Sequence, residues 1–132
     1  MPATPTALVI DDSRAMRMVV GRIVRAQGFD VLEAADGREA LAVLDARRDD
    51  LPRLALIDWN MPVMTGLEFI TAVRADPALR AVTLMMVTTE AERTQIVRAL
   101  AAGAHEYLIK PFTEDALVAK LRLLDVLPAV SA

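Results

Sequence analysis

The sequence predicts a single α/β domain in which five strand-helix units wind into a doubly wound, five-stranded parallel sheet of order 2-1-3-4-5. Two patterns support this prediction. Short apolar runs alternate with longer amphipathic segments, so a helix separates each pair of successive strands, and such connections wind parallel sheets with right-handed crossovers. Three candidate strands are apolar and two are mixed, as expected for central and edge strands respectively. A length of 132 residues suits one domain.

The five expected strands differ in how polar they are. The first, third and fourth are apolar and cover residues 7–10, 54–57 and 82–87. The second and fifth, at residues 30–34 and 105–110, carry charged side chains among the apolar ones. Placing these two at the edges selects the order 2-1-3-4-5. The competing order 3-2-1-4-5 would expose the third strand, which is wholly apolar.

Five helices are expected from apolar side chains that recur at helical spacing. The stripes are Met16, Val19, Val20 and Ile23; Leu41 and Leu44; Leu67, Ile70 and Val73; Ile96, Val97 and Leu100; and Leu117, Leu121 and Leu124. Residues typical of helix ends flank them. These are Ser13 before the first helix, Gly28 after it, Pro77 after the third, Gly103 after the fourth, and Thr113-Glu114-Asp115 opening the fifth.

Composition excludes several classes of function. The chain has no cysteine, which excludes disulfides, zinc-thiolate sites and cysteine nucleophiles. No apolar run approaches the ~20 residues of a spanning helix, so we expect no membrane insertion. A net charge of −3 argues against direct nucleic-acid binding. No positive charge precedes the first apolar stretch, so we expect no secretory signal and a cytoplasmic location.

Polar side chains follow the carboxyl ends of four expected strands. Asp11 and Asp12 follow the first strand, Asp58 the third, Thr88 the fourth and Lys110 the fifth. Open parallel sheets bind ligands beyond the carboxyl ends of their strands, where the strand order reverses, which here is between the first and third strands. We therefore expect these five side chains to form one site.

Three converging carboxylates predict a bound cation. At ~4 Å and an effective dielectric constant of ~20, each pair of unit charges costs about 4 kcal/mol. Oxygen ligands with room for water and a phosphate favour Mg²⁺ over an all-protein calcium cage. Taken singly, each residue has an ordinary interpretation as a solvated loop carboxylate, a helix cap, a turn hydroxyl or the end of an edge strand. Gly37 and Gly66 are interpreted as turn residues with no chemical role.

The motifs around these residues resemble response-regulator receiver domains from Ala7 to about Leu124. The matching stretches are Val9-Ile10-Asp11-Asp12-Ser13, Leu56 to Pro62 with Met64 and Gly66, Val87 to Ala91, Ala102-Gly103-Ala104, and Tyr107 with Lys110-Pro111-Phe112. The run Asp58-Trp59-Asn60-Met61-Pro62 is most similar to that of chemotaxis-type, CheY-like single-domain regulators. The resemblance implies a flavodoxin-like receiver domain over residues 7–125, an N-terminal extension of residues 1–6, and a tail of residues 126–132 too short for an output domain.

The resemblance also implies a role for each site residue. Asp58 would accept a phosphoryl group from the histidine of a sensor kinase. Asp12 and Asp58 would bind Mg²⁺ directly, together with the backbone carbonyl of Asn60, and Asp11 would act largely through metal-bound water. Lys110 would pair with the phosphoryl oxygens, and the Lys110-Pro111 bond is expected to be cis.

Switching residues are implied in the same way. The Thr88 hydroxyl would move toward the phosphoryl group and Tyr107 would turn inward with it. Asn60 and Glu90 occupy positions that tune the rate in this family. The output face would comprise the fourth helix, fifth strand and fifth helix, including Arg93, Ile96, Tyr107 and Lys120. Two residues depart from the family pattern: Thr89, where small residues are frequent, and His105, on the expected output face, which ordinarily would be an exposed edge-strand histidine.

The implied function is that of a stand-alone response regulator in a two-component phosphorelay. It would be a phosphoacceptor that catalyses its own phosphorylation and dephosphorylation, and no enzyme acting on other substrates. Its partners would be a sensor histidine kinase or phosphotransfer protein and an output target such as the flagellar motor switch. The alternatives within this class are a phosphate sink and a developmental or stress relay.

Two other classes of function are disfavoured. An aspartate-nucleophile phosphatase usually has its nucleophile on the first strand and a second aspartate two residues later. Here Asp11 and Asp12 are adjacent, and Asn60 follows Asp58 by two. A pseudo-receiver that binds partners without phosphorylation would not need all five of the site side chains, and all are present.

Overall fold

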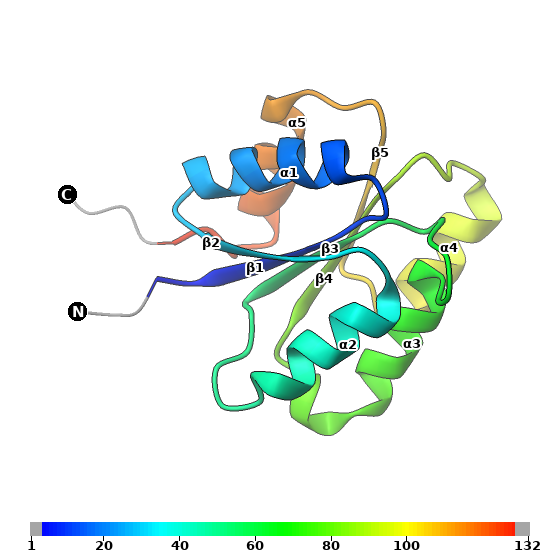
Figure 1. Cartoon of the computed structure of the whole chain (residues 1–132). Helices are drawn as coiled ribbons and strands as arrows, with labels where there is room; N and C mark the ends of the chain where they lie inside the picture. The colour runs from blue at the N-terminus through cyan, green and yellow to red at the C-terminus, as the bar shows by residue number, and fades with distance from the viewer. Residues whose placement is uncertain (1–3, 129–132) are drawn as a thin grey trace.

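Five parallel strands form the central layer, and helices cover both of its faces (Figure 1). This computed structural model describes residues 4–128. The strand order β2-β1-β3-β4-β5 confirms the predicted topology. The strands are β1 (Thr6–Ile10), β2 (Asp30–Ala34), β3 (Leu54–Ile57), β4 (Thr83–Thr88) and β5 (Glu106–Ile109).

The helices begin and end close to the predicted signals. They are α1 (Arg14–Ala26), α2 (Gly37–Ala46), α3 (Gly66–Ala75), α4 (Arg93–Ala102) and α5 (Glu114–Leu123), with a short 3₁₀ helix at Pro77–Leu79. The side chains of Ser13 and Thr113 accept hydrogen bonds from backbone N–H groups in the first turns of α1 and α5. Gly28 and Gly103 follow α1 and α4 at φ of 103° and 124°, a region that favours glycine.

The sheet separates two apolar cores. Helices α1 and α5 cover one face, and α2, α3 and α4 cover the other (Figure 1). Alternate residues of β1 divide between these cores, with Leu8 and Ile10 on the α2–α3–α4 side and Ala7 and Val9 on the α1–α5 side. Strands β1 and β3 are buried throughout, as predicted for central strands.

Three residues of the predicted apolar stripes are exposed. Val19 of α1 is 45% exposed, and Val97 and Leu100 of α4 are 57% and 42% exposed. Helix α4 packs on the core mainly through Ala99, which is fully buried, and Ile96, which is partly buried. Helical periodicity identifies apolar side chains on one face of a helix, but it does not distinguish a face that meets the core from one left open to a partner.

His105 is exposed, but it lies outside the strand predicted to contain it. It directly precedes β5, at the end of the strand away from Lys110, and its place on an output face stays a prediction. The imidazole Nδ1 of His105 accepts a hydrogen bond from the Leu84 N–H (3.1 Å). The backbone N–H of His105 donates to the Leu84 carbonyl (2.8 Å). Burial and the nearby Arg74 guanidinium lower the pKa of His105. The residue joins the starts of β4 and β5.

Arg74 of α3 connects the start of β4 to the end of α4. Its guanidinium donates to the carbonyls of Gly103 (3.1 Å) and Val82 (3.0 Å) and lies 3.3 Å from His105 Nδ1. A Cβ atom at Gly103 would lie 2.5 Å from Arg74 Cγ, so a larger residue there would displace the Arg74 side chain. Arg74 therefore holds the C-terminal end of α4 against α3 and β4.

The predicted terminal segments are described only in part. Strand β1 begins at Thr6, the last residue of the predicted extension, and residues 1–3 lie outside the described part of the chain. Val126, the first residue of the predicted tail, is 3% exposed, and Arg53 donates to its carbonyl (3.1 Å). Residues 129–132 lie outside the described part. No helix within residues 4–128 is long and apolar enough to cross a bilayer.

Core packing predicts different effects for two leucine truncations. Leu44→Ala should lower the free energy of unfolding by about 2–5 kcal/mol, because Leu44 is fully buried and its removal leaves a cavity. The matched change Leu123→Ala removes a side chain that is 72% exposed and should cost less than about 0.5 kcal/mol. Urea unfolding followed by circular dichroism measures both, and equal losses would contradict the assigned core.

Candidate functional site

The carboxylates meet because β1 and β3 are neighbours in register. Ile10 lies opposite Ile57, so the residues that follow, Asp11 and Asp58, leave the sheet side by side. The Asp58 N–H donates to the Ile10 carbonyl (3.0 Å), which continues the ladder into the site. One oxygen from each of Asp11, Asp12 and Asp58 lies within 4.8 Å of the other two. The predicted convergence of these three residues is confirmed.

The cluster is electrostatically costly. Asp11 is 4% exposed and Asp58 7% exposed, whereas Asp12 lies at the surface. At these separations and an effective dielectric constant of ~20, each pair of charges repels by roughly 3 kcal/mol. Burial is the main cause that raises the pKa of Asp58, and the charge of Asp11 raises this pKa further.

One oxygen of Asp58 has no hydrogen-bond partner. Asp58 Oδ1 is buried, and no described residue donates to it with good hydrogen-bond geometry. The Thr88 hydroxyl, the Lys110 charge and the Asn60 N–H, in that order, lower the pKa of Asp58 in part, without cancelling the effect of burial. Since nearly all buried polar atoms are paired, an unpaired carboxylate oxygen indicates a position prepared for a ligand or for chemistry.

Lys110 supplies the ammonium of the site from the end of β5. Its Nζ donates to Asp11 Oδ2 at 2.7 Å and lies 3.8 Å from Asp58 Oδ2, with only 11% of the side chain exposed. The Lys110-Pro111 peptide bond is cis, as expected. One ammonium against three carboxylates leaves two negative charges. A hard divalent cation fits that charge and the all-oxygen ligand set.

A chain of hydrogen bonds leads from the site to the edge of the sheet. The fully buried Thr88 presents its Oγ1 to the Glu90 N–H (3.3 Å), and the Glu90 carbonyl accepts from the Tyr107 hydroxyl (2.6 Å). Tyr107 is 7% exposed and thus already points inward. Its burial and the charges of Glu90 and Asp58 raise the pKa of Tyr107 to about 12, so the hydroxyl remains a donor at neutral pH.

The remaining predicted residues lie around this site. Asn60 and Thr89 are exposed on the loops after β3 and β4, next to Asp58 and Thr88. On the expected output face, Lys120 of α5 forms an ion pair with Glu106 of β5 (3.0 Å). Sequence periodicity did not identify Glu106, because a charged residue in an edge strand is ordinarily solvated.

Gly66 has a role beyond that of a turn residue. It begins α3, and its N–H donates to the Trp59 carbonyl (2.9 Å). A Cβ atom at this position would lie 2.5 Å from the Asp58 carbonyl oxygen and 2.9 Å from Trp59 Cα. Glycine therefore permits α3 to begin directly against the backbone that carries Asp58. A glycine at the start of a helix has no conformational need, and this was the feature of the sequence that could have indicated the close approach at Gly66.

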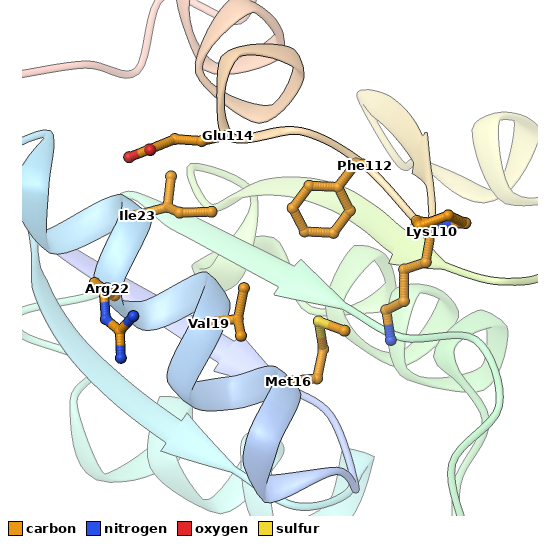
Figure 2. Close-up of a pocket in the computed structure, with 8 residues that line it drawn as sticks. Met16, Val19, Arg22, Ile23, Lys110, Phe112 and Glu114 are labelled. Atoms are coloured by element: carbon orange, nitrogen blue, oxygen red, sulfur yellow. The ribbon is translucent and has the colours of Figure 1, made fainter.

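A groove of about 350 Å³ adjoins the site without containing the carboxylates. It lies between α1 and the segment that connects β5 to α5 (Figure 2). Its walls are mainly apolar, formed by Met16, Val19, Ile23 and Phe112, and Lys110 lines one end. Lys110 is thus common to the groove and the acidic cluster.

Fold and site together define a receiver domain. The sequence matches the response regulator receiver domain over residues 7–122, and the chain belongs to that family. It is the receiver domain of a CheY-like response regulator, a class of signalling proteins.

Relatives include proteins named for chemotaxis. The chain is 41% identical to chemotaxis protein CheY1 of Helicobacter pylori over 118 residues, which span 89% of this chain and 94% of that protein. It is 42% identical to chemotaxis protein CheY of Pseudomonas aeruginosa over 115 residues, or 86% of this chain and 90% of the relative. The structure of Vibrio cholerae CheY4 superposes with a TM-score of 0.83 at 37% identity and covers 92% of this chain and 98% of its own.

The raised pKa of Asp58 predicts a pH-dependent gain in stability on neutralising it. The carboxyl titrates above its ordinary value of 3.8 in the folded protein, so ionisation opposes folding. This cost is absent below pH 3.8 and grows as the pH rises through the folded pKa. Asp58→Asn should therefore raise the thermal unfolding midpoint at pH 7 in the presence of EDTA, and the gain should disappear at acidic pH.

Asp49→Asn is the matched control for this measurement. Asp49 is exposed and outside the cluster, so the same chemical change should leave the midpoint within about 1 °C of the parent at both pH values. A midpoint at pH 7 that falls, or stays unchanged, in Asp58→Asn would show that burial of this carboxylate carries no energetic cost.

Proposed function

We propose that the chain is a stand-alone response regulator of a two-component phosphorelay that accepts a phosphoryl group on Asp58. The observation that carries this proposal is the buried, unpaired Oδ1 of Asp58, in a cluster of three carboxylates. Lys110 lies 3.8 Å from the other oxygen of the same side chain. A carboxylate held without a partner beside an ammonium is arranged to act as a nucleophile toward an anionic group.

The carboxylates of Asp11, Asp12 and Asp58 fit a magnesium ion, and the Asn60 carbonyl would complete the set of protein ligands. When bound, Mg²⁺ supplies positive charge that offsets the oxygens of the phosphoryl group during transfer. The protein's own contributions are separate. β1 and β3 hold the carboxylates together, and Lys110 keeps a second positive charge at the same edge.

In the proposed reaction, a carboxylate oxygen of Asp58 attacks the phosphorus of a phosphohistidine on a sensor kinase or phosphotransfer protein. The new O–P bond forms as the N–P bond breaks, and the histidine nitrogen leaves with that electron pair. Attack by water on the acyl phosphate later releases inorganic phosphate and restores the carboxylate. The chain thus promotes both its own phosphorylation and its own dephosphorylation, with Asn60 and Glu90 tuning the rates.

The hydrogen-bond chain through Glu90 offers a route from this reaction to the output face. The phosphoryl group adds ~1.5 to 2 negative charges and three acceptor oxygens. A Thr88 hydroxyl that turns to donate to those oxygens leaves the Glu90 N–H, and the same Glu90 backbone holds the Tyr107 hydroxyl. Changes at Asp58 therefore reach β5 and α4, where Val97 and Leu100 are exposed.

Control of the flagellar motor switch is the favoured output. Its support is the identity of 40% and above to proteins named for chemotaxis, over most of the chain. A phosphate sink or a developmental or stress relay would use the same five site residues, so the site does not discriminate among these pathways. The apolar exposed face of α4 favours a role that includes a protein target over a pure sink.

Trp59 makes the proposed chemistry measurable. It is the only tryptophan of the chain, follows Asp58 directly, and is 7% exposed. Addition of Mg²⁺ should change its fluorescence, and a small phosphodonor should then cause a second change that decays with time. Asp58→Asn should abolish the second change. A fluorescence record with neither change in the native protein would favour the pseudo-receiver.

Binding to the motor switch should depend on both phosphorylation and α4. A pull-down with the flagellar switch protein should retain the phosphorylated chain more strongly than the unmodified chain. Val97→Ala should weaken retention several-fold, because it removes exposed apolar area from α4. Val19→Ala, the same change at a 45% exposed position on α1, serves as the matched control. Retention unaffected by phosphorylation would favour the sink or relay.

A further inference from the structure

Arg17 lies beside the acidic cluster and contacts the backbone that carries it. Its Nη1 donates to the Asp11 carbonyl at 2.6 Å, and its Nε donates to Glu33 Oε1 on β2 at 3.0 Å. Only 16% of the Arg17 side chain is exposed. The Asp11 carbonyl belongs to the peptide group that joins Asp11 to Asp12, so the guanidinium fixes the plane of the link between the two carboxylates.

The other contacts of Asp11 leave Asp12 as the less constrained member of the pair. The Asp11 N–H donates to the Ala34 carbonyl (3.1 Å), and its carboxylate accepts from Lys110 and from the Ser13 N–H. Among residues 4–128, no side-chain hydrogen bond fixes the exposed Asp12 carboxylate, so the peptide plane that Arg17 holds is what sets the backbone position from which that side chain projects.

The position of Arg17 opposes local helix preference. It is the fourth residue of α1, whose first turn contains no acidic side chain. A cation near a helix N-terminus is unfavourable, because the helix dipole places positive charge there. A residue that breaks a local preference while it makes one hydrogen bond to the backbone of a site, and is held by a second to Glu33, is expected to serve that site.

We propose that Arg17 is a positioning residue for the magnesium site, held in place by Glu33, that orients Asp12 through the Asp11 carbonyl. This inference rests on the proposed function, since it concerns the affinity of the same cluster for Mg²⁺. The two possible roles of Arg17 predict opposite changes in Mg²⁺ affinity when the residue is removed. As a simple charge, Arg17 repels Mg²⁺, so its removal would tighten binding. As a positioning residue, its removal must weaken binding.

The test measures Mg²⁺ affinity by isothermal titration calorimetry and by Trp59 fluorescence. Arg17→Met should weaken Mg²⁺ binding about 10-fold, the usual scale for loss of a group that orients a metal ligand. Arg17→Lys keeps the charge but loses the planar fork that reaches both partners, so it should weaken binding in the same direction by a smaller factor. Arg14→Met is the matched control, because Arg14 is an exposed arginine in the same helical turn.

Each outcome decides between explanations. Mg²⁺ binding by Arg17→Met that equals or exceeds that of the native protein overturns the positioning role and leaves the proposed function intact. Absence of Mg²⁺ binding by the native protein contradicts the proposed function and, with it, this inference. Urea unfolding without Mg²⁺ verifies that each variant is folded. If Arg17→Met does not fold, the charge-conserving Arg17→Lys decides, because its affinity changes only if geometry matters.

Discussion

The arrangement of the site depends on the repulsion among three carboxylates at the carboxyl ends of β1 and β3. Asp11 and Asp58 are nearly buried, and Asp58 retains an oxygen without a partner. Lys110 neutralises only part of this charge. A fold selected for stability alone would pair or replace such groups, because buried unpaired charge is costly. The unpaired oxygen of Asp58 therefore indicates a position kept for a ligand or for chemistry.

Strand order decides which residues lie near these carboxylates. With β1 and β3 at the centre, the carboxylates leave adjacent strands, and β4 and β5 contribute a hydroxyl and an ammonium from the same side. The path from Asp58 to β5 is short for the same reason. Thr88 and Tyr107 lie on neighbouring strands, and the backbone of one residue, Glu90, makes hydrogen bonds with both.

The sequence contained enough information to predict the sheet order and the convergence of the site residues. Strand polarity distinguishes edges from centre, and residues that follow parallel strands must meet. Other features depend on contacts between distant segments. The exposure of Val97 and Leu100, the contact of His105 with Leu84, and the fit of Gly66 under Asp58 each need the packed positions of two elements. The proposed role of Arg17 likewise could not be predicted from the sequence, because it depends on a contact with the backbone carbonyl of Asp11, six residues earlier.

The hydrogen bond from Arg74 to the Gly103 carbonyl restrains one end of α4. The Arg74 guanidinium holds the C-terminal end of the helix to α3 and β4, and it packs directly against Gly103. The opposite end begins at Arg93, where Glu92 provides no side-chain cap, and follows the loop that carries Glu90. Helix α4 is therefore held at Gly103 and less constrained at its N-terminal end. A displacement of the loop after Thr88 would thus rotate α4 about Gly103 and move the N-terminal end of the helix farthest.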